Sequence, residues 1–380
     1  MKKMRRLLCL TMIVLLLFNI SGCKKDPIET ENDKETETQT QGESQETTRE
    51  ITDLAERKVT VSTKPSRVAT MQGPTYEMVF TLGAKDQIAL VREDHPTEYP
   101  LAQLTNPDIV NYATLGGVGP DASVNVEEFL NHEVDLVVYW NIEQELEKFD
   151  SAGIPAIVIN WSTFEPRNID EYQGDIKKQL FTLADILGGD APGRYKEWES
   201  YYDKTVEFIR SRTSQLKEDE FPSVYWGNTR GVDILSTYPM NPREFEVALC
   251  GGKLVSVEKG GQFPKITKEQ LLGWEPDVII VDNHGGKPEE IIETLKTGGD
   301  WISLPAVKND RIYRIPSGVF YLDKGTSRAV FYYWLAKELH PDLFRDVDLV
   351  EELKYYFTTF YDYDLSTEEA EKVIAGWVEK

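Results

Sequence analysis

Short β-branched runs alternate with helical patterns along most of this chain, and this alternation limits the folds that it can adopt. The predicted strands are 59–61, 67–70, 88–91, 134–139 and 156–160, followed later by 223–226, 278–281 and 312–315. Helical patterns begin at 76–82 and return at 242–250, 268–272 and 327–339. Strands that alternate with helices favour βαβ units and mostly parallel sheets. Two clusters of such strands therefore predict two α/β lobes.

The longest helical pattern, 171–216, lies between the two strand clusters. Apolar residues recur there at helical spacing, from Ile176 to Leu187 and again from Tyr195 to Ile209. The pattern fits two core helices of one domain or a helical connection between two lobes, and its central position favours the connection. We therefore expect a first lobe at 57–170, the connection at 171–216 and a second lobe at 217–380.

The N-terminus has the form of an export signal. Lys2, Lys3, Arg5 and Arg6 precede an apolar run, 7–20, that ends in Ile-Ser-Gly-Cys at 20–23. The run is about 14 residues, shorter than the roughly 20 of a membrane-spanning helix, so it predicts a cleaved signal peptide at 1–22. The ending resembles the lipobox of bacterial lipoproteins, which implies a lipid on Cys23. The alternative is an unmodified thiol beside an ordinary cleavage site.

A polar segment follows the signal. Residues 23–56 are rich in Glu, Thr and Gln and hold few apolar residues, so we expect a disordered acidic tether that lets the folded body work near a membrane. The net charge of -23 argues against nucleic acid as a partner. The 3 cysteines are Cys9, Cys23 and Cys250, so no disulfide framework is expected, and Cys250 reads as a buried apolar residue.

An internal repeat supports two lobes. Residues 127–138 can be laid over 269–280, and each segment has a glutamate in a helical first turn and an aspartate before an apolar strand. Asn125 and Thr267 are plausible helix caps, and Glu127 and Glu269 then lie where a carboxylate favours the helix dipole. Chance convergence on a common helix-turn-strand pattern is the alternative.

Several segments resemble the substrate-binding lipoproteins of ABC importers for ferric siderophores, cobalamin and haem, the class III periplasmic binding proteins. They are Pro-Ser-Arg-Val-Ala at 65–69, Glu-Pro-Asp-Val-Ile-Ile at 275–280, and the stretches 301–313 and 339–344. The resemblance runs from about residue 57 to the C-terminus. It implies two Rossmann-like lobes, one long connecting helix, and a ligand in the cleft between the lobes. It also implies that Glu127 and Glu269 pair with arginines of a permease; solvated cap carboxylates are the alternative.

Ligand contacts are expected in loops at the carboxyl ends of the strands, where open α/β sheets place their clefts. The first-lobe candidates are Gln72, Thr75, Tyr76, Arg92, His95, Trp140 and Trp161. The second-lobe candidates are Trp226, Asn228, Arg230, Tyr238, His284, Tyr321, Asp323 and Arg328. The aromatic faces suit a macrocycle or a catecholate shell, and core packing is the alternative for each of them. An arginine would grip a carboxylate or an oxyanion.

The ligand class stays open at this point. A metal chelate or corrinoid is the main expectation, with no intrinsic cofactor in the protein. A small oxyanion such as molybdate or tungstate is an alternative, and so is a bare transition-metal ion held by His95 and His284 with nearby carboxylates. Many relatives carry a tryptophan where this chain has Tyr321-Leu322-Asp323, which leaves the class undecided.

No motif of an enzyme stands out. The chain has no phosphate-binding loop, no H-E-x-x-H and no G-x-S-x-G, and the glycine-rich stretch 116–119 is followed by Pro120, so it reads as a loop. We expect a monomeric, lipid-anchored receptor, not an enzyme, that faces the extracytoplasmic side of a Gram-positive membrane or a periplasm. It would deliver its ligand to an ABC permease and its ATPase. An extracytoplasmic hydrolase and a purely structural surface lipoprotein are the alternatives.

Overall fold

The computed structural model describes residues 47–119, 122–159, 166–227, 234–237, 241–259, 264–282 and 287–376. The expected signal peptide, Cys23 and most of the expected tether lie outside these residues. No helix among them is long and apolar enough to cross a membrane.

The folded part begins earlier than the predicted boundary at 57. Strand β1 (Thr48–Thr52) pairs antiparallel with β2 (Lys58–Ser62), so the last residues of the expected tether form half of a hairpin. The turn is fixed by the buried Asp53 carboxylate, which accepts hydrogen bonds from the backbone N–H groups of Arg57 and Val158 and from the Arg57 guanidinium. The carboxylate holds the hairpin on the first sheet together with the bonds from Leu54 N to Val158 O and from Arg57 to Ala156 O, and composition does not reveal it.

The first sheet is parallel throughout and has the order β5-β4-β3-β6-β7. Its strands are β3 (Val68–Thr70), β4 (Ile88–Arg92), β5 (Ala113–Leu115), β6 (Leu136–Tyr139) and β7 (Ala156–Val158). Its helices are α1 (Gly73–Thr81), α2 (His95–Glu98), α3 (Pro100–Thr105), α4 (Val126–Asn131) and α5 (Glu143–Ser151), with 3₁₀ turns at Lys85–Gln87 and Pro107–Asn111. Strands that are buried on both faces have continuous apolar sequences, as β6 does.

The second sheet is also parallel and has the order β11-β10-β8-β9. Its strands are β8 (Ser223–Gly227), β9 (Lys253–Leu254), β10 (Val278–Val281) and β11 (Ile312–Arg314). The helices nearby in sequence are α8 (Asn241–Leu249), α9 (Lys268–Trp274), α10 (Pro288–Thr297) and α11 (Pro305–Lys308), with 3₁₀ turns at Glu218–Glu220, Val257–Lys259 and Gly299–Ser303. The expected α/β fold class with two parallel sheets is confirmed.

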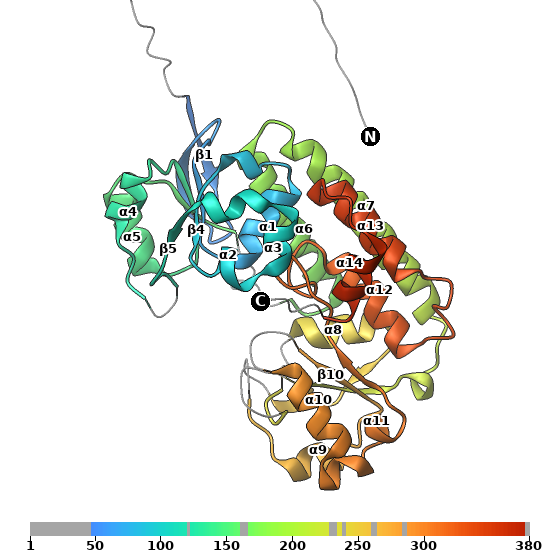
Figure 1. Cartoon of the computed structure of the whole chain (residues 1–380). Helices are drawn as coiled ribbons and strands as arrows, with labels where there is room; N and C mark the ends of the chain where they lie inside the picture. Colours follow the sequence, from blue (N-terminus) through green and yellow to red (C-terminus); the bar gives the residue numbers. More distant parts are fainter. Residues whose placement is uncertain are drawn as a thin grey trace, which may run out of the picture. The chain divides into compact units, whose positions relative to one another are not determined.

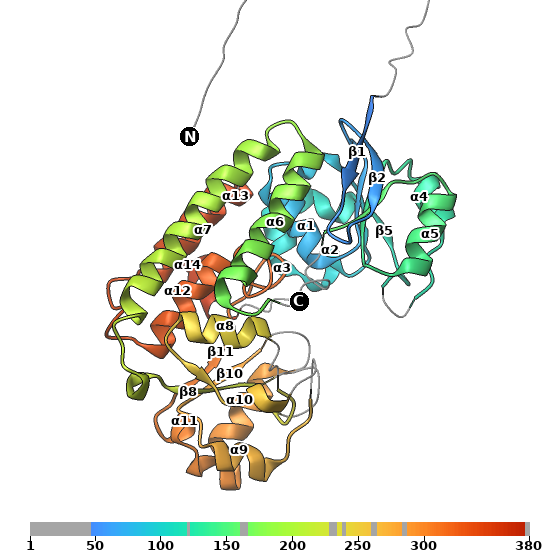
Figure 2. The ribbon, with the colours of Figure 1, turned by 180° about the vertical axis from the view of Figure 1, so that it is seen from behind.

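Two long helices join the sheets. Helix α6 (Ile169–Leu187) ends at Gly188 and Gly189, whose positive φ values of 67° and 57° form the turn into α7 (Ala191–Thr213). The two helices lie side by side (Figures 1 and 2). The helical pattern at 171–216 is therefore a helix pair.

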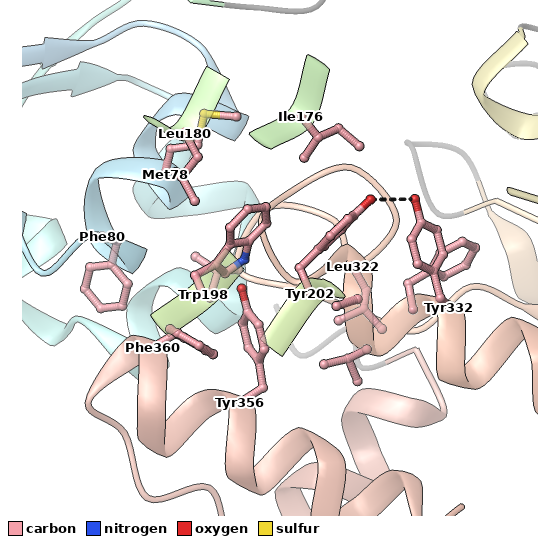
Figure 3. Close-up of a cluster of buried hydrophobic side chains, with 14 of the residues drawn as sticks. Met78, Phe80, Ile176, Leu180, Trp198, Tyr202, Leu322, Tyr332, Tyr356 and Phe360 are labelled. Carbon is pink, nitrogen blue, oxygen red and sulfur yellow. Dashed lines mark hydrogen bonds between the residues drawn. The ribbon is translucent and has the colours of Figure 1, made fainter. Parts of the chain in front are cut away.

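The C-terminal helices pack against both α7 and the first sheet's helix α1. Helix α12 (Arg328–Leu339) contacts α7, and α13 (Leu349–Tyr361) contacts α1, α12 and α14 (Thr367–Ile374). Figure 3 shows the core that results, where α1, α6, α7, α12 and α13 all contribute side chains. Tyr202 and Tyr332 share a hydrogen bond of 3.3 Å between their hydroxyls there. The C-terminal helices thus pack on α1 and α7, which lie much earlier in the sequence.

Candidate ligand site

Buried nitrogen atoms without partners gather after β3 and β4, where the first sheet's strands end. Gln72 precedes α1 and is 5% exposed, and its Nε2 has no hydrogen-bond partner among the described residues. His95 begins α2 and is 1% exposed, and neither ring nitrogen has such a partner. Because buried polar groups are nearly always hydrogen-bonded in native proteins, these nitrogens are candidate partners for a bound ligand.

His95 lies in an aromatic cluster. Its ring centroid is 5.8 Å from that of Tyr76 on α1 and 5.8 Å from that of Tyr99. Burial lowers the pKa of His95 from 6.5 to about 4, while Asp94 raises it and Arg92 lowers it. The imidazole is therefore neutral at pH 7, with one nitrogen able to donate and one able to accept.

The same cluster brings together residues that are far apart in the sequence. Tyr99 lies 5.2 Å from Phe320 and 5.7 Å from Tyr321, measured between ring centroids. Phe320 also covers the backbone of Gly73, since a Cβ atom at Gly73 would overlap its ring. Sequence reasoning placed Tyr76, His95 and Tyr321 in the site but missed Tyr99. The aromatic residue just before Pro100, close to His95, was the available signal.

Other first-sheet candidates are engaged in local contacts. The Thr75 hydroxyl donates to the backbone oxygen of Gln72 at 2.7 Å, which fixes the start of α1. The Arg92 guanidinium pairs with the Asp94 carboxylate, which accepts its Nε–H at 2.6 Å. Trp140 follows β6 and packs edge-on against Tyr139, with 5.0 Å between ring centroids.

The second group of candidates forms a buried charge network. Glu246 on α8 pairs with Arg243 at 2.5 Å and with Arg328 at 3.2 Å, and Arg243 also pairs with Asp323. The Arg243 guanidinium lies 4.4 Å from the ring centroid of Trp226, which is fully buried. Two arginines and two carboxylates balance in charge, as burial requires. Sequence reasoning missed Arg243 and Glu246, because nothing in a helix pattern tells that both will turn inward.

Several expected site residues lie outside the described residues: Trp161, Asn228, Arg230, Tyr238 and His284. The proposed pairing of His95 with His284 is therefore untested. Among the residues that the structure describes, no three His, Cys, Asp or Glu side chains group as metal ligands. Cys250 is buried as expected, and burial raises the pKa of its thiol.

The two glutamates of the internal repeat begin equivalent helices. Asn125 caps α4 by accepting the N–H of Glu127 at 3.3 Å, and Thr267 caps α9 by accepting the N–H of Gln270 at 3.2 Å. Both Glu127 and Glu269 are exposed, and neither forms an ion pair with any described residue. Hydrogen bonds from the backbone and from Thr267 lower the pKa of Glu269. Each carboxylate is therefore available to a cationic partner.

Similarity to known proteins identifies the family of this chain. Residues 68–319 match the family described as periplasmic binding protein, and the chain belongs to this family. The molybdate-binding protein MolA of Haemophilus influenzae is 24% identical over 82% of this chain and 90% of its own length. The Fe(3+)-citrate-binding protein YfmC of Bacillus subtilis is 22% identical over 80% of this chain and 87% of its own length.

Solved structures show the same fold. A periplasmic solute-binding protein of Veillonella parvula superposes with a TM-score of 0.72 at 23% identity, covering 86% of this chain and 97% of that one. Molybdate-bound MolA gives a TM-score of 0.72 at 22% identity, covering 84% and 99%. The chain is thus an extracytoplasmic solute-binding component of an ABC importer, which confirms the resemblance in the sequence.

Proposed function

We propose that this protein captures a metal chelate or corrinoid, of the ferric siderophore, cobalamin or haem class, and delivers it to its permease. The cluster of Tyr76, His95, Tyr99, Phe320 and Tyr321 carries this proposal, because Phe320 and Tyr321 stay partly exposed on it and the unpartnered nitrogens of His95 lie within it. The metal would be cargo, and the protein would work as a monomer without a resident cofactor or a reaction of its own.

A small oxyanion such as molybdate is the second candidate. Gln72 Nε2 is a buried donor without a partner in the described part of the chain, and neutral His95 can supply a second donor. Arg92 and Arg328, by contrast, already pair with carboxylates. An oxyanion would therefore be held through neutral donors, and the similarity to a protein named for molybdate binding agrees with this candidate.

Lipid anchoring at Cys23 is part of the proposal. The lipobox-like ending at 20–23 and the polar segment behind it support an acylated cysteine at the end of a tether. Mass spectrometry of the protein from its native membrane should find a diacyl or triacyl mass on Cys23. Cys23→Ser should release the protein from the membrane fraction, and retention of that variant in the membrane would contradict the anchor.

A thermal-shift panel tests the ligand class. The panel holds ferric citrate, ferric siderophores, cyanocobalamin, haemin, molybdate, tungstate, and free nickel, cobalt and zinc. A ligand at a hundred times its Kd adds about 2.7 kcal/mol, which raises Tm by several degrees. A selective shift with a chelate or corrinoid supports the main candidate, and a shift with oxyanions alone supports the second. Shifts with bare ions alone would contradict both.

A further inference from the structure

One face of helix α1 is buried under residues 320–328, which we call the brace segment. Gly73, Glu77 and Thr81 are spaced four residues apart, so they lie on one side of the helix, and all three are buried. Phe320 covers Gly73, and Thr326 contacts both Glu77 and Thr81. The brace segment thus runs along the length of α1.

Glu77 is the strongest attachment between the two. Its side chain is 0% exposed, and Oε1 accepts four hydrogen bonds. The donors are Thr326 Oγ1 at 2.8 Å, Ser327 N at 3.0 Å, Ser327 Oγ at 3.1 Å and Tyr361 Oη at 2.7 Å. Oε1 thus accepts from both the brace segment and α13, while Oε2 has no hydrogen-bond partner among the described residues, and breaking bonds to a buried acceptor is costly. Glu77 therefore strongly favours this one position of the brace segment.

Neighbouring groups support the same geometry. The hydroxyls of Thr81 and Thr326 are 2.6 Å apart, and since the Thr326 proton goes to Glu77, Thr81 is the donor to Thr326. The Trp198 indole on α7 donates to the Thr326 backbone oxygen at 2.9 Å. No side chain fits at Gly325, because a Cβ atom there would overlap the Glu77 carboxylate.

The brace segment also carries three expected ligand contacts, Tyr321, Asp323 and Arg328. Tyr321 packs on Tyr99 beside His95, and Asp323 pairs with Arg243 of α8. Arg328 donates to the backbone oxygens of Asp323 and Lys324, which closes the segment on itself. The segment therefore connects α1 with α8, next to the candidate ligand site.

We propose that Glu77 is a positioning residue for the ligand site: its buried carboxylate fixes the brace segment, and with it Tyr321, Asp323 and Arg328, against helix α1. The proposal rests on the proposed function, since Tyr321 belongs to the aromatic cluster that carries that function, while Asp323 and Arg328 link the segment to α8. Glu77 itself is fully buried, so it acts on the site through the brace segment. The acceptor oxygen matters here more than the charge, so glutamine should replace glutamate better than alanine does.

Hydrogen exchange and ligand binding together test this role in the whole protein. In Glu77→Ala, amide exchange in a peptide covering 320–328 should rise at least about tenfold, because the Ser327 N–H loses its acceptor. Affinity for ferric citrate or molybdate, whichever saturates the wild type, should fall about tenfold. Glu77→Gln should restore most of both. Tyr361→Phe, which removes one donor, offers a milder variant if the alanine protein does not fold.

Asp53→Asn is the matched control. Asp53 is also a buried, hydrogen-bonded carboxylate, but it holds the β1–β2 hairpin. The Asp53→Asn variant should have a lower free energy of unfolding, with unchanged amide exchange in 320–328 and unchanged ligand affinity. Unchanged exchange in Glu77→Ala would overturn the proposal, and so would faster exchange with unchanged affinity. If neither probe saturates the wild type, the ligand assignment fails, while the exchange result alone still decides whether Glu77 fixes the segment.

Discussion

The two copies of the internal repeat share a scaffold but differ in what surrounds it. In each copy a capped helix leads through a left-handed glutamate, Glu133 or Glu275, into a buried strand. Asp135 then accepts hydrogen bonds from Ser66, and Asp277 accepts them from Ser223, at the start of the neighbouring strand. These shared bonds indicate that the repeat is structural, which leaves the chemistry to the loops.

The helix starts show the difference. The residue before Glu127 is Val126, whereas the residue before Glu269 is Lys268, which pairs with Asp300 and lies 5.3 Å from the Trp301 ring centroid. Lys268 is thus occupied by its own lobe and leaves Glu269 free. Neither Glu127 nor Glu269 forms an ion pair with a described residue, although their neighbours differ, which agrees with a common role for the two carboxylates.

The largest expected effect comes from reversing both charges. Glu127→Arg with Glu269→Arg should lower uptake of the bound ligand by more than about a hundredfold, because like charges at an interface cost several kcal/mol. Ligand affinity should not change. Uptake by cells and affinity by calorimetry provide the two readings. The control is Glu197→Arg with Glu207→Arg on α7, which should leave uptake intact; lost affinity in the first variant would contradict the docking role.

The burial of His95 beside the first sheet should make the free energy of unfolding depend on pH. Burial lowers its pKa from 6.5 to about 4 in the folded protein. Between these two pH values His95 is therefore protonated in the unfolded chain and neutral in the folded protein. The free energy of unfolding should therefore decline by roughly 3 kcal/mol as the pH falls from 6.5 to 4. Denaturant titrations across this range check the value. His95→Gln should flatten the slope, and an equal slope in both proteins would refute the assignment.

Removing either of the two equivalent aspartates, Asp135 or Asp277, should lower the free energy of unfolding by a similar amount. Asp135→Ala and Asp277→Ala each remove an acceptor at the start of a strand and should each lower the free energy of unfolding by about 1 to 3 kcal/mol. Asp108→Ala, at an exposed position, serves as the control and should change little. A large cost at one aspartate and none at the other would show that the repeat is not equivalent in energy.

The smallest effects are expected at the left-handed glutamates. Glu133 and Glu275 have φ values of 50° and 45°, so Glu133→Gly and Glu275→Gly should each stabilise the protein by about 0.5 to 1 kcal/mol. Glu128→Gly inside α4 should instead destabilise it by about 1 kcal/mol. Thermal unfolding of the three variants is the test, and destabilisation by all three would contradict the strain at the repeat.

The sequence predicts the strands that are buried along their length and misses those that stay partly exposed. The runs at 67–70, 156–160 and 278–281 match β3, β7 and β10, which are fully buried, while β5 (Ala113–Leu115) and β9 (Lys253–Leu254) are partly exposed and show no apolar run. The polar composition of β1 predicts a tether and not a strand. Local patterns carry such information only where a segment is buried by itself.

The site was less readable than the fold. Loops at the carboxyl ends of strands could be found from strand positions, which led to Gln72, Tyr76 and His95. The partners of Asp323 and Glu77 could not, because Arg243 and Thr326 are distant in sequence and no local pattern brings them together. Their inward orientation follows from helix packing across the whole chain.

The central claim is that one ligand is held by residues of both halves of the chain, and calorimetric titration tests it most directly. With the ligand that the thermal-shift panel selects, the wild type should bind one equivalent. Gln72→Ala in the first half and Trp226→Phe, which removes the buried indole N–H together with part of the ring, in the second should each weaken binding by about tenfold. Wild-type affinity in either variant, or the absence of saturable binding, would contradict the account.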